Sequence, residues 1–218
     1  MAFDPYEQAR LRMVDEQLRG RGIRDERVLA AMSRVPRHEF VAPEFADKAY
    51  GDYPVPVPVR QTVSQPYIVA AMIESLRLRG HENLLEIGTG TGYQAAVLAE
   101  LARVVYTIER HETLARLARE NLERLGHRNI QVVHGDGTLG LPQHAPFDAI
   151  MVAAAAPQVP PALVEQLAPD GRMIVPVGTR ESQALQLIQK RGNDVLSTTL
   201  EGCRFVPLLG EEGFEETE

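Results

Sequence analysis

The feature that most constrains the fold is an apolar segment followed by three alternating glycines. Residues 84–93 read Leu-Leu-Glu-Ile-Gly-Thr-Gly-Thr-Gly-Tyr. The apolar part is typical of a buried strand, and the residues after the glycines are typical of a helix. Glycine adopts positive φ and lets a ligand approach the backbone closely. The stretch therefore predicts a strand–loop–helix unit with a ligand site at the carboxyl end of the strand.

Strand-like and helix-like segments alternate after this loop. This order predicts a doubly wound α/β sheet of about seven strands, mostly parallel, with helices on both faces. The last strands lack long helices between them, so that edge of the sheet is expected to be partly antiparallel. Strands are expected at 83–87, 103–108, 130–133, 147–152, 171–177, 184–189 and 204–208, and helices at 93–101, 112–125 and 160–167.

The first 80 residues have a different pattern. Apolar spacing predicts helices at 5–19, 25–34 and 66–78, forming an N-terminal helical extension. Prolines at positions 43, 54, 56 and 58 predict an extended strap between the second and third of these helices, over residues 42–60. We expect residues 1–80 to pack on a core of residues 81–210 as one structural domain and to contribute a substrate loop. Residues 211–218 are expected to be a solvated acidic tail.

Charge and composition exclude several classes of protein. The net charge of −7 argues against a general nucleic-acid binder, which needs a basic face. No run approaches the roughly 18 apolar residues that span a bilayer, so no membrane association is expected. The first residues lack the basic and apolar regions of a signal peptide, and Cys203 is the only cysteine. These features favour a cytoplasmic protein.

Acidic residues follow the next two predicted strands. Glu109 lies 21 residues after Gly88, at the end of the second strand of the core. A carboxylate at this place accepts hydrogen bonds from both hydroxyls of a ribose. Asp136 stands between two glycines after the third strand, where it is placed to accept a hydrogen bond from the amine of an adenine. The alternative is that Gly88, Gly90 and Gly92 only turn the chain, but the three strand ends together favour a nucleoside site.

Two ligands fit this arrangement to different degrees. A nicotinamide dinucleotide needs a cradle for its pyrophosphate, and Tyr93 occupies the place of the last small residue of that motif. S-adenosylmethionine has no phosphate and carries two positive charges. The carboxylate of Glu86 attracts such a cation and repels a pyrophosphate. The pattern favours S-adenosylmethionine, although Glu86 alone fits a purely structural role equally well.

Several further motifs, together with the glycine loop, show that the chain resembles the protein-L-isoaspartate O-methyltransferase family. The element Ser-Gln-Pro before the core and the element Arg-Phe-Val-Pro-Leu near the end are the most specific. The resemblance covers about residues 8–210. The motifs are Gln61-Thr-Val-Ser-Gln-Pro66, Leu85-Glu-Ile-Gly-Thr-Gly-Thr-Gly-Tyr93, Val133-His-Gly-Asp-Gly137, Phe147-Asp-Ala-Ile150, Ala153-Ala-Ala-Ala-Pro157, Leu167-Ala-Pro-Asp-Gly-Arg-Met-Ile-Val-Pro-Val-Gly178 and Arg204-Phe-Val-Pro-Leu208.

The resemblance implies a class I methyltransferase (Rossmann-like) fold and S-adenosyl-L-methionine as the methyl donor, leaving S-adenosyl-L-homocysteine. It implies methylation of the free α-carboxylate of L-isoaspartyl residues in damaged proteins and peptides. The methyl ester then converts through a succinimide back to aspartate, so the enzyme serves protein repair. We expect a monomer that binds no nucleic acid. The alternative is a class I methyltransferase that acts on another carboxylate or on a small molecule.

The resemblance also assigns roles to individual residues. Ser64 matches the active-site serine, and Thr62 and Val63 match residues that line the donor and substrate pockets. Val206 and Pro207 match a segment that closes over the substrate. The matched donor-binding residues are Glu109 on the ribose side and Asp136 with Gly137 on the adenine side, in addition to Glu86, Gly88, Gly90 and Gly92 of the glycine loop.

Methyl transfer to a carboxylate needs few acid–base groups. A carboxyl group with a pKa of about 4 is already ionised at neutral pH, so neither a general base nor a metal is required. A neutral donor such as the Ser64 hydroxyl can orient the carboxylate without overstabilising it before transfer. Serine is also a favoured N-cap, and Pro66 suits the first turn of a helix. If Ser64 caps that helix, Val63 or Thr62 must orient the substrate instead.

No metal site is expected. The six histidines are scattered, and none has zinc-ligand spacing with cysteine or carboxylate partners. Cys203 is interpreted as a small buried residue of a strand.

Overall fold

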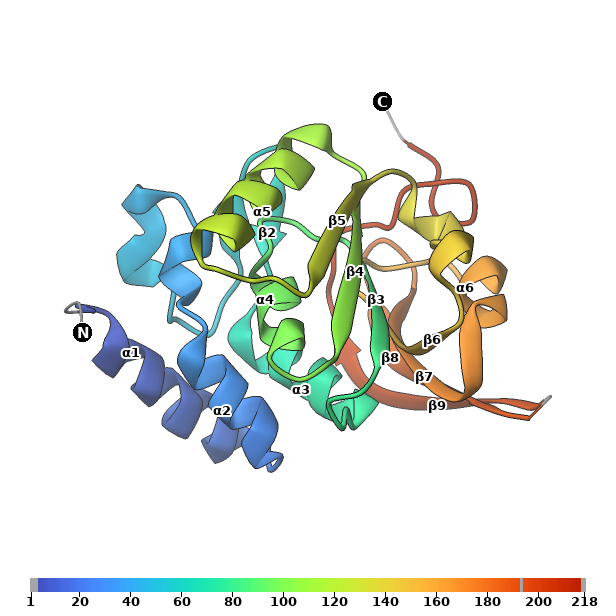
Figure 1. Ribbon diagram of the computed structural model, residues 1–218, viewed down its shortest axis with the longest axis horizontal. Coiled ribbons are helices and arrows are strands. Elements are labelled where there is room, and N and C mark those ends of the chain that lie inside the picture. The colour runs from blue at the N-terminus through green and yellow to red at the C-terminus, as the bar shows by residue number, and fades with distance from the viewer. Residues whose placement is uncertain (1–3, 193, 217–218) are drawn as a thin grey trace.

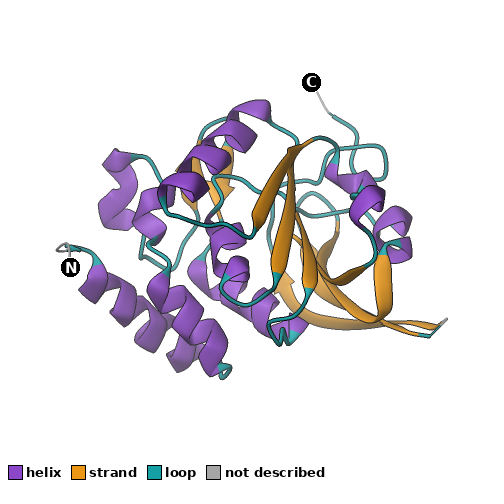
Figure 2. Cartoon of the chain, in the orientation of Figure 1, coloured by secondary structure: helices purple, strands orange, loops and turns teal. Residues whose placement is uncertain are grey.

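The computed structural model describes residues 4–192 and 194–216, and its centre is a seven-stranded sheet (Figures 1 and 2). The strand order is β5-β4-β3-β6-β7-β8-β9. The first five of these strands are parallel, and β8 and β9 are antiparallel to their neighbours. The strands are β3 (Asn83–Ile87), β4 (Val104–Glu109), β5 (Ile130–His134), β6 (Phe147–Val152), β7 (Leu167–Gly178), β8 (Gln183–Arg191) and β9 (Asp194–Cys203).

Helices cover both faces of this sheet, as the alternating strand and helix pattern predicts. On one face, Leu84 belongs to a core shared with α3 (Pro66–Leu76) and α4 (Tyr93–Ala99). On the opposite face, Leu85 belongs to a second core with Leu163 of α6 (Pro161–Glu165). Successive strand residues point to opposite faces, so a strand buried on both sides is apolar throughout. α5 (Glu112–Arg124) lies beside α4 and packs on β4 and β5.

The first two helices of the N-terminal extension add a layer outside α3 and α4 (Figure 1). Its first helix begins as α1 (Glu7–Arg12), continues as a π-helix over Met13–Leu18 and ends in a 3-10 turn at Arg19–Arg21. Gly22 ends it in the left-handed conformation, with φ of 107°. α2 (Glu26–Arg34) follows, and the Asp25 carboxylate caps it by accepting a hydrogen bond from the Arg27 N–H at 2.8 Å.

The proline-rich strap is only partly extended. Residues Arg37–Phe40 and Pro43–Lys48 form 3-10 helices, so the expectation of an extended segment from residue 42 is wrong there. Pro43 occupies a first-turn position, where the missing N–H of proline has no cost. The rest forms a hairpin of β1 (Val55–Val57) and β2 (Gln61–Val63). This hairpin leads directly through Ser64 and Gln65 into α3.

The end of the chain departs most from the expectations. The predicted strand at 204–208 is wrong, because the last strand is β9. Strand β9 is a polar, exposed edge strand whose side chains give little periodic signal. Residues 205–208 are apolar because they cover the carboxyl end of β6, where Leu208 is buried. The tail is partly exposed over residues 211–216, but it is tied to the core, since the Glu211 and Glu212 N–H groups donate hydrogen bonds to Asp136 and Thr138.

No helix in the described ranges is long and apolar enough to cross a bilayer.

Candidate active site

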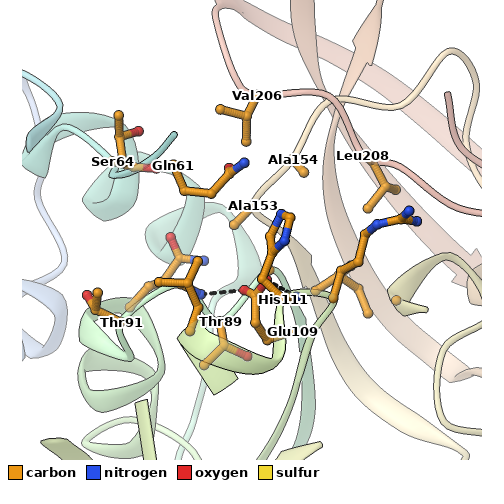
Figure 3. Close-up of a pocket in the computed structure, with 18 of the residues that line it drawn as sticks. Gln61, Ser64, Thr89, Thr91, Glu109, His111, Ala153, Ala154, Val206 and Leu208 are labelled. Atoms are coloured by element: carbon orange, nitrogen blue, oxygen red, sulfur yellow. Dashed lines mark hydrogen bonds between the residues drawn. The ribbon is translucent and has the colours of Figure 1, made fainter. Parts of the chain in front are cut away.

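A cleft lies at the carboxyl ends of β3 and β4, at the topological switch point where the order of the strands reverses. From β3 the chain moves outward through β4 to β5 and then crosses to β6 on the other side of β3. Open α/β sheets bind ligands at such a switch point. The first cleft, as we name it, is lined by the glycine loop, the end of β4, the hinge at residues 61–64 and the segment 206–209. Figure 3 shows Ser64 and Gln61 on one side of it and Leu208 on the other.

The three glycines of the loop have two different roles. Gly88 and Gly90 line the first cleft, with φ of 94° and 57°. Gly92, with φ of 97°, does not line it and instead faces α5, where an added Cβ would lie 3.2 Å from the Leu122 Cγ. The Gly88 N–H donates to the Ile108 carbonyl at 2.9 Å, which holds the loop against β4. The loop therefore offers two glycines to a ligand and uses the third for packing.

Glu109 is the best-placed acid of the site. It ends β4, lines the first cleft and is 5% exposed. Its Oε2 accepts a hydrogen bond from the Gly90 N–H at 2.8 Å, and its Oε1 accepts one from the His111 N–H at 2.9 Å (Figure 3). Each carboxylate oxygen has a second lone pair. The side chain is thus held in place while it keeps acceptor capacity for a diol.

Glu86 lies one layer behind the cleft and not in its lining. The side chain is fully buried, and its Oε2 accepts a hydrogen bond from the Thr107 hydroxyl. Its Oε1 has no hydrogen-bond partner among the described residues. Burial raises the pKa of Glu86 to about 8, which the Thr107 hydrogen bond only partly opposes. In the ligand-free protein the neutral form is therefore favoured at pH 7, and the electrostatic role that the sequence argument gave to Glu86 stays a prediction.

Asp136 also lies outside the lining of the first cleft. Its Oδ1 accepts hydrogen bonds from the N–H and the hydroxyl of Thr138, at 2.9 and 2.7 Å. Its Oδ2 accepts one from the Glu211 N–H at 2.9 Å. These hydrogen bonds hold the pKa of Asp136 below its ordinary value, although burial opposes them. The carboxylate therefore fastens the C-terminal tail, while the neighbouring Gly137 lines the cleft.

The hinge between β2 and α3 presents Thr62, Val63 and Ser64 to the first cleft. The N-cap of α3 is Gln65, and no side-chain hydrogen bond caps the helix. Ser64 is therefore not the cap that its position before Pro66 suggested. The substrate-binding role of Ser64 stays a prediction, and its position in the lining of the cleft is compatible with it.

A second cleft continues from the hinge away from the glycine loop. It has a volume of about 570 Å³, which is within the range of clefts that bind ligands. Val206 and Pro207 lie between the two clefts and line both. The Ala155 N–H donates to the Val206 carbonyl at 2.8 Å, and the Leu208 N–H donates to the Ala155 carbonyl at 2.7 Å. The residues shared by the two clefts are Thr62, Ser64, Ala153, Val206 and Pro207.

Several lining residues escaped the sequence argument. Some of them could have been predicted from their place in the sequence. These are the polar residues between and after the glycines, and His111, which lies two positions after Glu109. Leu209 has none, because only the path of the tail brings it to the cleft. Gln94 is buried, and its Nε2 has no partner among the described residues. The additional lining residues include Thr89, Thr91, Gln94, His111, Leu114, Ala153, Ala154, Leu208 and Leu209.

Within residues 4–192 and 194–216, no group of three or more His, Cys, Asp or Glu side chains is placed to hold a metal ion. Cys203 ends β9 and is half-buried, and it lines the second cleft.

A glycine loop at the switch point, a buried acid after the next strand and an adjoining open cleft define a class I methyltransferase, of Rossmann-like fold. A sequence model of the protein-L-isoaspartate(D-aspartate) O-methyltransferase family matches residues 9–213. The chain belongs to this family and is a methyltransferase, which confirms both the resemblance and the predicted fold class.

Relatives of known name agree with this placement. The protein-L-isoaspartate O-methyltransferase of Koribacter versatilis is 56% identical over 94% of this chain and 92% of its own length. Protein-L-isoaspartate O-methyltransferase 1 of Syntrophobacter fumaroxidans is 53% identical over 96% of this chain and 98% of its own.

Solved structures of the same family share the fold. One protein-L-isoaspartate O-methyltransferase superposes with a TM-score of 0.82 at 28% identity, over 94% of this chain and 66% of that one. A putative Plasmodium falciparum enzyme in complex with S-adenosyl-L-homocysteine superposes with a TM-score of 0.78 at 26% identity. That match covers 92% of this chain and 98% of the other.

Proposed function

We propose that this chain transfers a methyl group from S-adenosylmethionine to the free α-carboxylate of L-isoaspartyl residues in damaged proteins and peptides. The product ester closes to a succinimide that reopens as aspartate. The observation that carries the proposal is the position of Ser64, on the wall shared by the first cleft, beside the glycine loop and Glu109, and the second cleft. Membership of the family supplies the substrate class.

The first cleft is assigned to the methyl donor. Glu109 would accept the ribose hydroxyls on the lone pairs that Gly90 and His111 leave open. Gly88 and Gly90 let the donor approach the loop, and Gly137 lines the adenine side. The Plasmodium falciparum relative holds S-adenosyl-L-homocysteine, which supports this assignment. Neither Glu86 nor the Asp136 carboxylate is assigned a direct contact, because both lie outside the lining.

The second cleft is assigned to the isoaspartyl peptide, with Thr62, Val206 and Pro207 between peptide and donor and Val63 on the donor side. The Ser64 hydroxyl donates a hydrogen bond to one carboxylate oxygen, and the other oxygen attacks the methyl carbon. The new C–O bond forms as the C–S bond breaks, and the electron pair returns to sulfur to give a neutral thioether. No proton moves in this step, so the protein contributes alignment and exclusion of water.

A neutral hydroxyl suits this reaction better than a cation would. The carboxylate loses its charge in the transition state, so a lysine at this point would stabilise the substrate more than the transition state. Ser64 can orient the carboxylate at a smaller cost to the rate.

The alternative substrate is another carboxylate or a small molecule. A cleft of about 570 Å³ can hold either kind of substrate, so the preference for the isoaspartyl peptide comes from the family to which the chain belongs. We also propose that the protein is a monomer and that it is cytoplasmic. The single cysteine supports the second point, because it suits a reducing compartment.

The test is methyl transfer from isotope-labelled S-adenosylmethionine to an L-isoaspartyl peptide, with the aspartyl peptide of the same sequence as the control. We expect label on the isoaspartyl peptide only, in an ester that is lost on mild base treatment. Equal labelling of both peptides, or of neither, would contradict the proposal. Labelling of a free dicarboxylic acid in preference to the peptide would favour the alternative.

A further inference from the structure

Arg37 is a buried cation that the reaction scheme leaves unexplained. Its side chain has no exposed surface, although arginine is almost never fully buried without a partner of opposite charge. Among the described residues it forms no ion pair within 4 Å. Burial lowers the pKa of Arg37 from its ordinary value, yet an arginine remains protonated in a folded protein.

The partners of this guanidinium are backbone carbonyls and an aromatic ring. Its Nε donates to the Ala49 carbonyl at 2.7 Å, and one terminal nitrogen donates to the Val63 carbonyl at 3.3 Å. Its central carbon lies 4.7 Å from the centre of the Tyr93 ring. The other terminal nitrogen, Nη1, has no partner among the described residues. Arg37 thus joins the strap, the hinge and the first residue of α4.

Such an arrangement is costly to keep for packing alone. Burying an ion without a counter-ion is unfavourable, and apolar residues of similar volume often replace buried ions with no loss of stability. A leucine or methionine here would still fill the space beside Tyr93. What it would not do is bind the Val63 carbonyl, which lies one residue before Ser64.

We propose that Arg37 is a positioning residue that sets the orientation of Ser64 through the Val63–Ser64 peptide group. This peptide is planar and trans, so its carbonyl and its N–H point in opposite directions. A carbonyl fixed on the buried guanidinium directs the Ser64 N–H away from it and limits the rotation of the Ser64 backbone. The inference rests on the proposed role of Ser64 in binding the substrate carboxylate.

The contact with Tyr93 also connects Arg37 to the wall of the first cleft. Tyr93 is 1% exposed and lines that cleft, next to the glycine loop. Because one rigid guanidinium touches both Tyr93 and the hinge, it fixes the hinge relative to the wall of the donor site. In-line transfer is sensitive to misplacement of this kind, since an error of about 1 Å can reduce the rate about 100-fold.

Arg10 provides a matched control. It is also a buried arginine of the N-terminal extension, 8% exposed. It donates to the Ser33 carbonyl at 2.7 Å and to the Tyr50 hydroxyl at 3.3 Å, and it pairs with Asp4 at 2.7 Å. These partners lie in the N-terminal helical region and the strap, and none of them belongs to the hinge at residues 61–64 or is Tyr93. Loss of Arg10 therefore reports what the removal of a buried arginine does to the extension as a whole.

The experiment compares wild type, Arg37→Met, Arg37→Lys and Arg10→Met. For each, kcat and KM are measured with an isoaspartyl peptide, Kd is measured with S-adenosyl-L-homocysteine, and Tm is recorded. We expect both Arg37 variants to lose at least about 10-fold in kcat at saturating substrates, with donor Kd within about threefold of wild type. Arg10→Met should keep the wild-type kcat even if its Tm falls as far. The lysine variant retains charge and most of the volume, so it reports the carbonyl contacts if the methionine variant fails to fold.

Three results would overturn the inference. The first is a folded Arg37 variant with wild-type kcat and KM. The second is a loss of kcat in Arg10→Met as large as in Arg37→Met, which would mark a general effect of the extension. The third is a parallel loss of donor affinity, which would place the role of Arg37 in the donor site. Failure of the proposed function itself would look different, because the wild-type chain would then not methylate the peptide.

Discussion

The Glu109 carboxylate accepts a hydrogen bond from the Gly90 backbone N–H at 2.8 Å. This contact ties the end of β4 to the glycine loop that follows β3, so two walls of the donor site are fixed by one side chain. The His111 N–H binds the second oxygen at 2.9 Å, and the acid is therefore oriented before any ligand arrives.

Replacing Glu109 should weaken donor binding before it affects turnover. In Glu109→Gln an NH₂ group replaces one of the two acceptor oxygens. This donor then faces another donor, either a backbone N–H or a ribose hydroxyl, so one hydrogen bond is lost. We expect Kd for S-adenosyl-L-homocysteine to rise about 10- to 100-fold, corresponding to the 1–3 kcal/mol of a lost charge-assisted hydrogen bond. Calorimetry measures Kd, and kcat at saturating donor should stay within a few-fold of wild type. Glu112→Gln, at an exposed acid of α5, is the control. An unchanged Kd in Glu109→Gln would remove the ribose role.

Replacing Ser64 should give the opposite pattern. The hydroxyl does not cap α3, so Ser64→Ala leaves the helix intact and removes only the hydrogen bond to the substrate. We expect kcat/KM for an isoaspartyl peptide to fall about 10- to 100-fold and donor Kd to change less than about twofold. Ser75→Ala is the matched control, because its hydroxyl donates to the Ala71 carbonyl on the same helix. Wild-type peptide kinetics in Ser64→Ala would contradict the assigned role.

Glu86 should make the stability of the ligand-free protein depend on pH. Burial raises its pKa from 4.5 to about 8, so between these values the folded state holds a proton that the unfolded state has released. The free energy of unfolding therefore falls as pH rises through this window, by at most about 1.4 kcal/mol per pH unit. The stabilising contribution is complete below about pH 4.5 and is lost above about pH 8.

The variant Glu86→Gln should remove this dependence. Near pH 5 wild type carries a protonated acid that resembles the amide, so the two Tm values should be similar. At pH 8.5 wild type must bury a carboxylate, and the variant should melt at a higher temperature. Thermal unfolding at several pH values measures the difference. A constant offset between variant and wild type across pH 5–8.5 would mean that Glu86 does not titrate in this range.

Replacing Asp136 should loosen the C-terminal tail more than it weakens the binding of the methyl donor. Its carboxylate accepts hydrogen bonds from Thr138 and from the Glu211 N–H. We expect Asp136→Ala to cost about 1–3 kcal/mol of stability and to speed amide hydrogen exchange at Glu211. Glu123→Ala, at an exposed position of α5, is the control. A loss of donor affinity above about tenfold with unchanged exchange would instead favour the adenine contact that the sequence suggested.

Local pattern was sufficient for the strands that are buried on both faces of the sheet. The predicted strands Asn83–Ile87 and Phe147–Val152 coincide with β3 and β6, because strands covered on both faces must be apolar and are bounded by polar or glycine residues. The exposed edge strand β9 was not predicted, because a strand that is not covered need not be apolar. Its side chains face solvent, so neither composition nor periodicity distinguishes it from a loop.

The position of a site residue was predictable where it lies at the end of a predicted strand, as Glu109 does. It was not predictable where it depends on a partner that is distant in the sequence. Glu86 and Glu109 look alike in the sequence, but one lies inside its strand under the loop and the other at the end of its strand, facing the cleft. Asp136 meets Glu211 across 75 residues, and Arg37 meets Val63 across 26. The sequence by itself determined the alternation of elements, the glycine loop and the family, since these depend on local spacing. Burial and pairing depend on which distant segments share a surface, so only the tertiary structure decided which acid faces the ligand and which cation holds the hinge.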